Sequence, residues 1–324
     1  MRLPSLPVAS LAALLVATPA FAASDYFALG DSITFGETNL AYVPSYGDRG
    51  YVAGVADYIA ALNGGPRPNV TDLAIDGETT TSFFTNAGRT PPVVGRGDAP
   101  LQLENLNYST TASSQYDVLA AKVAAAQAAG DTVDNVSITL GFNDLAALAS
   151  LPPADALAAI DQTLVTYRTD YGNVLTQIRA LLPNATLYVL GYYNPFPADM
   201  TSPAASIFNT GGVALNGIIG DLAAQYGGLY IETAPAFIGN EAAYTYLAEQ
   251  PANATVAGEY GGALPIGNVH PNALGYAAIA GAVSGSSGQI ESMVPEPAAW
   301  TLMIGGFGLV GAAVRRSRRL ATAG

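Results

Sequence analysis

The chain has no cysteine, and only one histidine and one tryptophan among its 324 residues. Without thiols it needs no disulfide and has no thiol to be oxidised outside the cytoplasm. It shows no zinc-type spacing of ligands, no phosphate-binding Walker loop and no internal repeat. Its stability must therefore come from an ordinary core, and its one imidazole is the side chain best suited to act as a base near neutral pH.

Basic residues are also scarce. There are 12 Lys and Arg against 25 Asp and Glu, which gives a net charge of −13 at pH 7. Five of the basic residues lie near the two ends, so the remaining body is more acidic still; they are Arg2, Arg315, Arg316, Arg318 and Arg319. This balance excludes a nucleic-acid partner. The 50% hydrophobic content is enough for one large domain or two small ones.

Both ends have the composition of targeting segments. Residues 1–23 contain Arg2, an apolar stretch and Ala20-Phe21-Ala22, which together predict a secretory signal peptide. Near the other end, residues 298–314 form an apolar stretch that could just span a bilayer as a transmembrane helix. The arginines after it would stay in the cytoplasm. Residues 285–293, which begin with Gly-Ser-Ser-Gly, are predicted to be a linker.

Residues 294–319 resemble the PEP-CTERM sorting signal of Gram-negative bacteria. They contain Pro295-Glu296-Pro297, then the apolar stretch, then the arginine cluster. The resemblance implies recognition by an exosortase, cleavage near the Pro-Glu-Pro, and export to the cell envelope, outer surface or extracellular matrix. The membrane would then be met only through the tail before processing. The alternative is an ordinary C-terminal membrane anchor.

The body, residues 24–284, has the pattern of one α/β domain. Strand-length apolar runs alternate with helix-like stretches, which favours βαβ units and a mainly parallel sheet. The predicted strands are 26–29, 71–75, 136–140, 187–190 and 229–231. The predicted helices are 51–62, 118–129, 154–182 with a possible break at Tyr171-Gly172, 213–226 and 273–283.

Polar turns follow the predicted strands. Gly30-Asp31-Ser32 follows the first, Asp76-Gly77-Glu78 the second and Gly141-Phe142-Asn143-Asp144 the third. His270 is expected to open the last helix, because Pro271 suits the first helical position. Ligands bind beyond the carboxyl ends of parallel strands, so these side chains should gather at one edge of the sheet. A serine there with a histidine partner predicts nucleophilic catalysis.

These four blocks, in this order, resemble the SGNH or GDSL-type hydrolase family. Ser32 matches the nucleophile, Gly77 the glycine, Asn143 the asparagine and His270 the base. The resemblance implies a three-layer α/β/α flavodoxin-like fold and ester hydrolysis through an acyl-enzyme, with no metal or organic cofactor. The oxyanion hole would combine the backbone N–H groups of Ser32 and Gly77 with the Asn143 amide. A Gly-x-Ser-x-Gly elbow is missing, which disfavours an α/β-hydrolase-fold esterase.

The chain departs from the family pattern at the acid that orients the histidine. Family members commonly have Asp three residues before it, and this chain has Gly267. Three explanations stay open: a backbone carbonyl orients His270, Glu259 substitutes for the acid, or the enzyme is impaired. Asp76 is a lesser departure, because a small polar residue commonly precedes this glycine in the family.

The sequence thus predicts a secreted serine esterase or lipase acting on a lipid, a small ester or an acylated polysaccharide. An exopolysaccharide O-deacetylase is a variant suggested by the tail. A non-catalytic matrix-binding or surface-binding protein on the same fold is the alternative suggested by Gly267. Tyr192 and Tyr193, after the fourth predicted strand, are interpreted either as one border of the substrate cleft or as buried packing.

Overall fold

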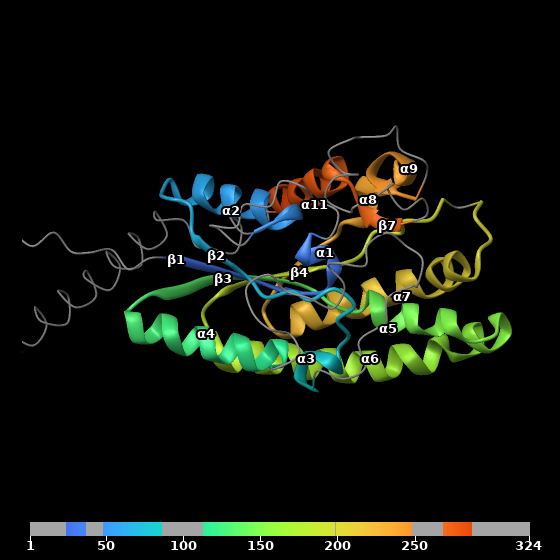
Figure 1. The fold of residues 1–324 in the computed structure, drawn as a ribbon, viewed down its shortest axis with the longest axis horizontal. Helices are drawn as coiled ribbons and strands as arrows, with labels where there is room; N and C mark the ends of the chain where they lie inside the picture. Colours follow the sequence, from blue (N-terminus) through green and yellow to red (C-terminus); the bar gives the residue numbers. More distant parts are fainter. Residues whose placement is uncertain (1–23, 37–47, 86–112, 198, 248–267, 287–324) are drawn as a thin grey trace, which may run out of the picture.

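Five parallel strands form the centre of the molecule in the computed structural model, which describes residues 24–36, 48–85, 113–197, 199–247 and 268–286 (Figure 1). The strands are β1 (Ser24–Gly30), β2 (Asn69–Asp72), β3 (Thr132–Thr139), β4 (Thr186–Leu190) and β5 (Leu229–Ile231). They pair in the order β2-β1-β3-β4-β5. Each lies within a few residues of its predicted position. The strands could be predicted because helices cover both faces of a parallel sheet, so its strands appear in the sequence as continuous apolar runs.

Helices pack on both faces of the sheet and make three layers (Figure 1). One face carries α2 (Gly50–Asn63) and α11 (Ala273–Ser286); the other carries α4 (Gln115–Ala129), α6 (Pro153–Leu181) and α7 (Pro203–Gln225). The shorter elements are α1 (Ser32–Phe35), α3 (Ser82–Thr85), α5 (Phe142–Ala146), η1 (Ala147–Ser150), α8 (Ala234–Phe237), α9 (Glu241–Tyr244), β6 (Thr245–Tyr246) and β7 (Asn268–Pro271). The predicted α/β/α fold class is therefore confirmed.

Helix α6 runs unbroken through Tyr171-Gly172, so the possible break there was wrong. A glycine inside a helix costs about 1 kcal/mol relative to alanine. Packing offsets this cost: Tyr171 is fully buried and stacks on Tyr167, with ring centroids 5.2 Å apart. A β-carbon at position 172 would meet Leu222 of α7 at an ordinary contact distance of 3.8 Å, so this packing does not depend on glycine.

Helix α7 begins at Pro203, well before the predicted start at Val213. Ser202 caps it, because its hydroxyl accepts a hydrogen bond from the backbone N–H of Ala205 at 3.2 Å. The pair Gly211-Gly212 hid the first half of this helix from sequence reasoning. Gly211 packs closely on α6: a β-carbon there would lie 3.1 Å from the side chain of Ile160, which would have to shift by a few tenths of an ångström.

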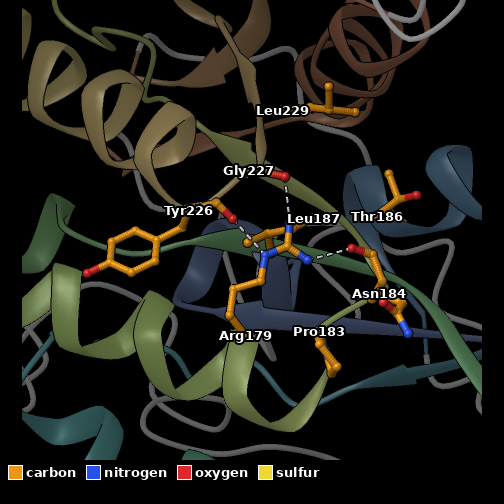
Figure 2. Close-up of a pocket in the computed structure, with 9 residues that line it drawn as sticks. Arg179, Pro183, Asn184, Thr186, Leu187, Tyr226, Gly227 and Leu229 are labelled. Atoms are coloured by element: carbon orange, nitrogen blue, oxygen red, sulfur yellow. Dashed lines mark hydrogen bonds between the residues drawn. The ribbon is translucent and has the colours of Figure 1, made fainter. Parts of the chain in front are cut away.

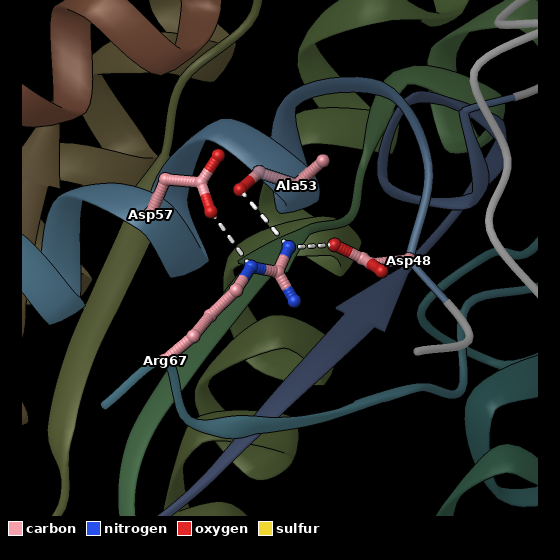
Figure 3. Close-up of polar contacts among 4 residues, drawn as sticks. All are labelled: Asp48, Ala53, Asp57 and Arg67. Carbon is pink, nitrogen blue, oxygen red and sulfur yellow. Dashed lines mark hydrogen bonds and ion pairs between the residues drawn. The ribbon is translucent and has the colours of Figure 1, made fainter. Parts of the chain in front are cut away.

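An arginine fixes α2 to the loop that leads into β2 (Figure 3). The Arg67 guanidinium contacts the carboxylates of Asp48 and Asp57 and donates to the carbonyl of Ala53 at 3.3 Å. Asp48 is buried whereas Asp57 is exposed. Partial burial lowers the pKa of Arg67, but the two carboxylates raise it by more, so the pKa lies above its ordinary value. The contacts stabilise the start of α2, which packs beside α1.

The two predicted targeting segments lie outside the described residues, as do Glu259 and Gly267. Within the described part of the chain, no helix is long and apolar enough to cross a membrane. The signal peptide and the transmembrane helix therefore stay predictions, as does the linker at 285–293, whose first two residues belong to α11 and whose others lie outside the described residues.

Candidate active site

The turn that carries the candidate nucleophile, Gly30-Asp31-Ser32, lies at the end of β1 and is called the nucleophile turn. Gly30 ends the strand at φ +121°, and a β-carbon there would lie 1.8 Å from the carbonyl oxygen of Thr139, so only glycine fits. Asp31 then caps α1, because its Oδ1 accepts from the backbone N–H of Ile33 at 3.1 Å. Ser32 is the first residue of this short helix, and its backbone N–H has no acceptor within the helix.

Ser32 and His270 meet directly although they lie far apart in the sequence. The Ser32 Oγ is 2.7 Å from the His270 Nε2. Ser32 is 6% exposed and His270 is half-buried. A serine hydroxyl donating to a neutral imidazole at this distance can lose its proton to that ring as it attacks a carbonyl.

His270 lies in strand β7 rather than at a helix start, which corrects the sequence expectation. Strand β7 pairs antiparallel with β6, and Thr245 lies opposite Pro271. The residue that caps the following helix is Asn272, whose Oδ1 accepts from the backbone N–H groups of Leu274 and Gly275 at 3.0 and 3.1 Å. A capping side chain outranks the proline signal here, because Asn satisfies orphan donors that Pro cannot.

The asparagine block follows β3. Asn143 lies in α5, is 8% exposed, and donates through Nδ2 to the carbonyl of Glu78 at 2.9 Å. That bond fixes the plane of an amide that carries two N–H groups. Its neighbour Asp144 accepts from Thr80, from the hydroxyl at 2.5 Å and from the backbone N–H at 3.2 Å. The second and third blocks are thus joined by side chain to backbone bonds.

Gly77 lies in the tight turn that Asn143 holds. The N–H of Glu78 donates to the carbonyl of Ile75 at 3.1 Å, which closes a four-residue turn with Gly77 in its third position. Gly77 has φ +76°, which a residue with a side chain rarely adopts. The N–H of Ile75 also donates to the carbonyl of Gly30 at 3.0 Å, so this turn lies beside the nucleophile turn.

Two buried polar residues of the site, Gln115 and Glu78, were given no role by the sequence. Gln115 pairs with Gly30 as a neighbouring strand would: its Oε1 accepts from the Gly30 N–H at 2.7 Å and its Nε2 donates to the Gly30 carbonyl at 2.9 Å. Gln115 also donates to Glu78 at 3.1 Å, and the Ser82 hydroxyl donates to the other oxygen of Glu78. Both side chains are fully buried, which the polar sequence around them did not indicate.

Asp31 was treated as part of the motif only, yet its side chain is fully buried beneath the serine. It accepts from the Tyr192 hydroxyl at 2.5 Å and from the Thr139 hydroxyl at 3.0 Å. Burial raises the pKa of Asp31 to about 7, although these hydrogen bonds and the nearby His270 act in the opposite direction. A carboxyl with this pKa can hold or lose its proton near neutral pH.

From Asp31 a chain of buried hydroxyl groups continues under the sheet edge. It passes from Thr139 to Thr34 at 2.7 Å and from Thr34 to Tyr51 at 2.8 Å. It ends with Tyr51 and Tyr26 on the hydroxyl of Ser137, at 3.1 and 2.7 Å. Each member finds a partner, so the network fixes the nucleophile turn without leaving these polar groups unsatisfied.

A cavity of about 430 Å³ lies away from these residues, at the amino ends of β4 and β5 (Figure 2). Arg179 stands in it but donates to three backbone carbonyls, those of Ala185, Tyr226 and Gly227, at 2.6 to 2.7 Å. Partial burial lowers the pKa of Arg179. A smaller cavity of about 130 Å³, lined in part by Tyr192 and Phe208, lies at the carboxyl edge.

Comparisons with known proteins agree with this geometry. A family model described as the GDSL-like lipase/acylhydrolase family matches residues 28–278, and a model of the PEP-CTERM protein-sorting motif matches residues 294–319. No curated protein sequence matches the chain. Both resemblances stated from the sequence are therefore confirmed.

Solved structures are similar in fold. Phospholipase A1 from Streptomyces albidoflavus NA297 is 20% identical, with a TM-score of 0.51, over 82% of this chain and 100% of its own. An extracellular lipase from Streptomyces rimosus gives the same values. The lipase Lip_vut3 from a goat rumen metagenome is 19% identical, with a TM-score of 0.52, over 81% of this chain and 96% of its own.

Proposed function

Because the chain belongs to the GDSL-like lipase/acylhydrolase family, whose members hydrolyse ester bonds, we propose that it is an exported serine esterase or lipase in which Ser32 is the nucleophile and His270 the base. The 2.7 Å contact between the Ser32 Oγ and the His270 Nε2 is the observation that supports this assignment. It requires no metal and no organic cofactor, because the attacking oxygen and the proton acceptor are both side chains.

The reaction proceeds in two balanced halves. The Ser32 oxygen attacks the acyl carbonyl while His270 takes the hydroxyl proton, and the tetrahedral intermediate collapses to an acyl-serine. The alcohol leaves with the proton from His270. Water then attacks the acyl-serine, gives its proton to His270, and releases the acid as the proton returns to Ser32.

The negative charge of the tetrahedral intermediate needs hydrogen-bond donors that are already in place. The backbone N–H groups of Ser32 and Gly77 and the side-chain amide of Asn143 are proposed for this role. Their supports are the turn that holds Gly77 at positive φ and the bond from Asn143 to the Glu78 carbonyl. A β-carbon at position 77 would hinder the approach of substrate to the backbone.

The sorting motif supports a proposal about where the protein is located. The match at residues 294–319 indicates export and a surface-associated location in a Gram-negative bacterium. We propose in addition that residues 1–23 are a signal peptide, that residues 298–314 form a transmembrane helix before processing, and that an exosortase cuts near Pro295. Intact mass of the envelope-associated protein tests this, because a retained Arg318 contradicts cleavage there.

The motif also favours a second substrate class, acetyl groups on an exopolysaccharide, since a matrix-associated enzyme meets such chains. In this variant Ser32 would carry an acetyl group and the alcohol would be a sugar hydroxyl. Chain-length preference separates the two candidates, because a deacetylase accepts acetyl esters and rejects long acyl chains. The third hypothesis, a binding protein without activity, predicts no turnover that depends on Ser32.

The deciding experiment measures hydrolysis of p-nitrophenyl esters of increasing acyl length by the full-length protein and by Ser32→Ala. Ser150→Ala is the matched control, because Ser150 is exposed and its hydroxyl contacts only the carbonyl of Ala147. We expect Ser32→Ala to abolish turnover and the control to retain it. If Ser32→Ala leaves turnover unchanged, the assignment fails. No turnover on simple esters leads to acetylated exopolysaccharide as the next substrate.

A further inference from the structure

Tyr192 and Tyr193 lie one residue beyond the end of β4 and are almost fully buried, at 5% and 4% exposure. Side chains at successive positions of an extended chain point to opposite sides. One ring therefore lies toward the nucleophile turn and the other toward the strand that carries His270. The sequence suggested packing or a cleft border for these rings, and neither interpretation uses the two hydroxyl groups.

The Tyr192 hydroxyl reaches the residue before the nucleophile. It donates to the Asp31 Oδ2 at 2.5 Å. The backbone of Tyr192 is itself fixed from α7, because Asn216 accepts from its N–H at 2.8 Å and donates to its carbonyl at 2.7 Å. The Tyr192 ring also contacts Phe142, with centroids 5.8 Å apart, next to Asn143.

The Tyr193 hydroxyl reaches the residue before the base. It donates to the carbonyl of Val269 at 2.8 Å. Its ring stacks on Phe237 of α8, with centroids 3.9 Å apart and planes at 13°, and Phe237 in turn meets the edge of Tyr244. Strand β7 pairs with β6 and is not part of the five-stranded sheet. The hydrogen bond from the Tyr193 hydroxyl therefore links the end of β4 directly to β7, the strand that carries His270.

We propose that Tyr192 and Tyr193 are positioning residues for the proposed esterase reaction: from one strand end, one hydroxyl holds the residue before Ser32 and the other holds the residue before His270, and together they set the separation between nucleophile and base. This inference rests on the proposed function of Ser32 and His270. Neither hydroxyl needs to touch substrate. Position 267, where the family commonly has the orienting Asp, is glycine in this chain. Hydrogen bonds from other residues are therefore more important for orienting His270.

The two hydroxyls differ in one respect, because Tyr192 contacts a carboxyl and Tyr193 a carbonyl. The titratable groups around Asp31 are His270 in β7, Tyr51 in α2, Tyr167 and Tyr171 in α6, and Tyr192 itself. Burial raises the pKa of each of these tyrosines, so all four stay neutral near pH 7. Among the described groups around Asp31, this leaves the Asp31 carboxyl, whose pKa is about 7, beside the imidazole of His270.

Loss of the Tyr192 hydroxyl should therefore change the pH profile. Its hydrogen bond lowers the pKa of Asp31, so Tyr192→Phe keeps Asp31 protonated to higher pH. The protonated Asp31 carboxyl puts less negative charge beside His270, which favours the neutral imidazole. Activity depends on neutral His270, so its rise with pH should move to lower pH. Tyr193→Phe removes no bond to a charged group and should leave the profile in place.

The experiment compares Tyr192→Phe, Tyr193→Phe and the double variant with the wild type, as full-length protein, by kcat, KM and pH profile on a p-nitrophenyl ester. Displacement of the reacting groups by about 1 Å can cost ~100-fold, so we expect kcat to fall about 10- to 100-fold in each variant, with KM within about twofold. Tyr226→Phe is the control, because its hydroxyl bonds to Thr176 at the other edge of the sheet.

A second readout separates positioning from a general loss of structure. Thermal unfolding should differ little between Tyr193→Phe and the control, while only the former loses rate. In an Asp31→Asn background, Tyr192→Phe should no longer move the pH profile. Unchanged kcat in both tyrosine variants overturns the inference while the esterase assignment stands. A wild type with no turnover that depends on Ser32, on simple esters and on acetylated exopolysaccharide, overturns both.

Discussion

The two edges of the sheet differ in a way that cavity size does not reveal. Of the two cavities described above, the one at the amino edge is the larger, at about 430 Å³, and it holds Arg179 (Figure 2). That arginine already donates to three backbone carbonyls. The other cavity, of about 130 Å³, lies at the carboxyl edge, where Ser32 meets His270 and buried side chains hold the turns around them. Chemistry follows the strand ends, where a backbone turn exposes a side chain on a rigid support.

The largest expected effect breaks the contact between Ser32 and His270. Ser32→Ala and His270→Ala should each abolish ester hydrolysis, because neither the nucleophile nor the base works alone. The double variant should be little worse than either single one, since residues that act as a unit do not give additive losses. Rates of acyl transfer to water, measured for the three variants, test this. Strongly additive losses contradict the pairing.

Asn143→Ala should have the next largest effect. Removal of one donor from an oxyanion hole typically lowers turnover by about 10²- to 10³-fold. KM should change much less than kcat, because the donor acts mainly on the charge of the transition state. Asn240→Ala is a suitable control, because Asn240 is exposed and, among the described residues, its side chain donates only to the backbone carbonyl of Ala236 in α8. Equal losses in the two variants argue against a role in the oxyanion hole.

The sequence predicted this carboxyl edge well because its residues are local to strand ends. Strand order along the chain and the turns at Ser32, Gly77 and Asn143 follow from short apolar runs and glycines, which need no tertiary information. The site residues that the sequence did not reveal are held by contacts between residues far apart in the chain. Gln115 pairs with Gly30, and Tyr192 with Asp31, through bonds that no local pattern encodes. His270 was placed at a helix start, because Asn272 was not recognised as the cap.

The two buried carboxyl groups at the carboxyl edge, those of Asp31 and Asp144, should lower the free energy of unfolding of the protein as pH rises. The pKa of Asp31 is raised to about 7 and that of Asp144 to about 6, both mainly by burial. The folded state therefore binds more protons than the unfolded state between about pH 4 and 7, and their contribution to stability falls over that window. Asp31 causes the larger part of this loss, and Asp31→Asn removes it. The free energy of unfolding of the variant, measured relative to wild type, should therefore be a few kcal/mol higher at pH 8 than at pH 4.

Denaturant unfolding of wild type and Asp31→Asn at pH 4 and pH 8 measures this gain directly. The hydrogen bonds from Ile33 and Thr139 can be kept by the amide oxygen of asparagine, so any fixed cost of the substitution appears at both pH values and cancels in the difference. A difference that is the same at both pH values contradicts a buried titrating carboxyl at position 31.

The smallest effect on activity is expected at the amino edge. Arg179→Met keeps most of the aliphatic stem but removes all three donors to the carbonyls of Ala185, Tyr226 and Gly227. The free energy of unfolding should fall by about 1–3 kcal/mol, because bonds from a charged donor are lost at a partly buried site. Ester hydrolysis should stay at the wild-type rate, since Arg179 lies on the edge opposite Ser32. Turnover lost in Arg179→Met, with the protein still folded, contradicts the division of the molecule into a chemical and a structural edge.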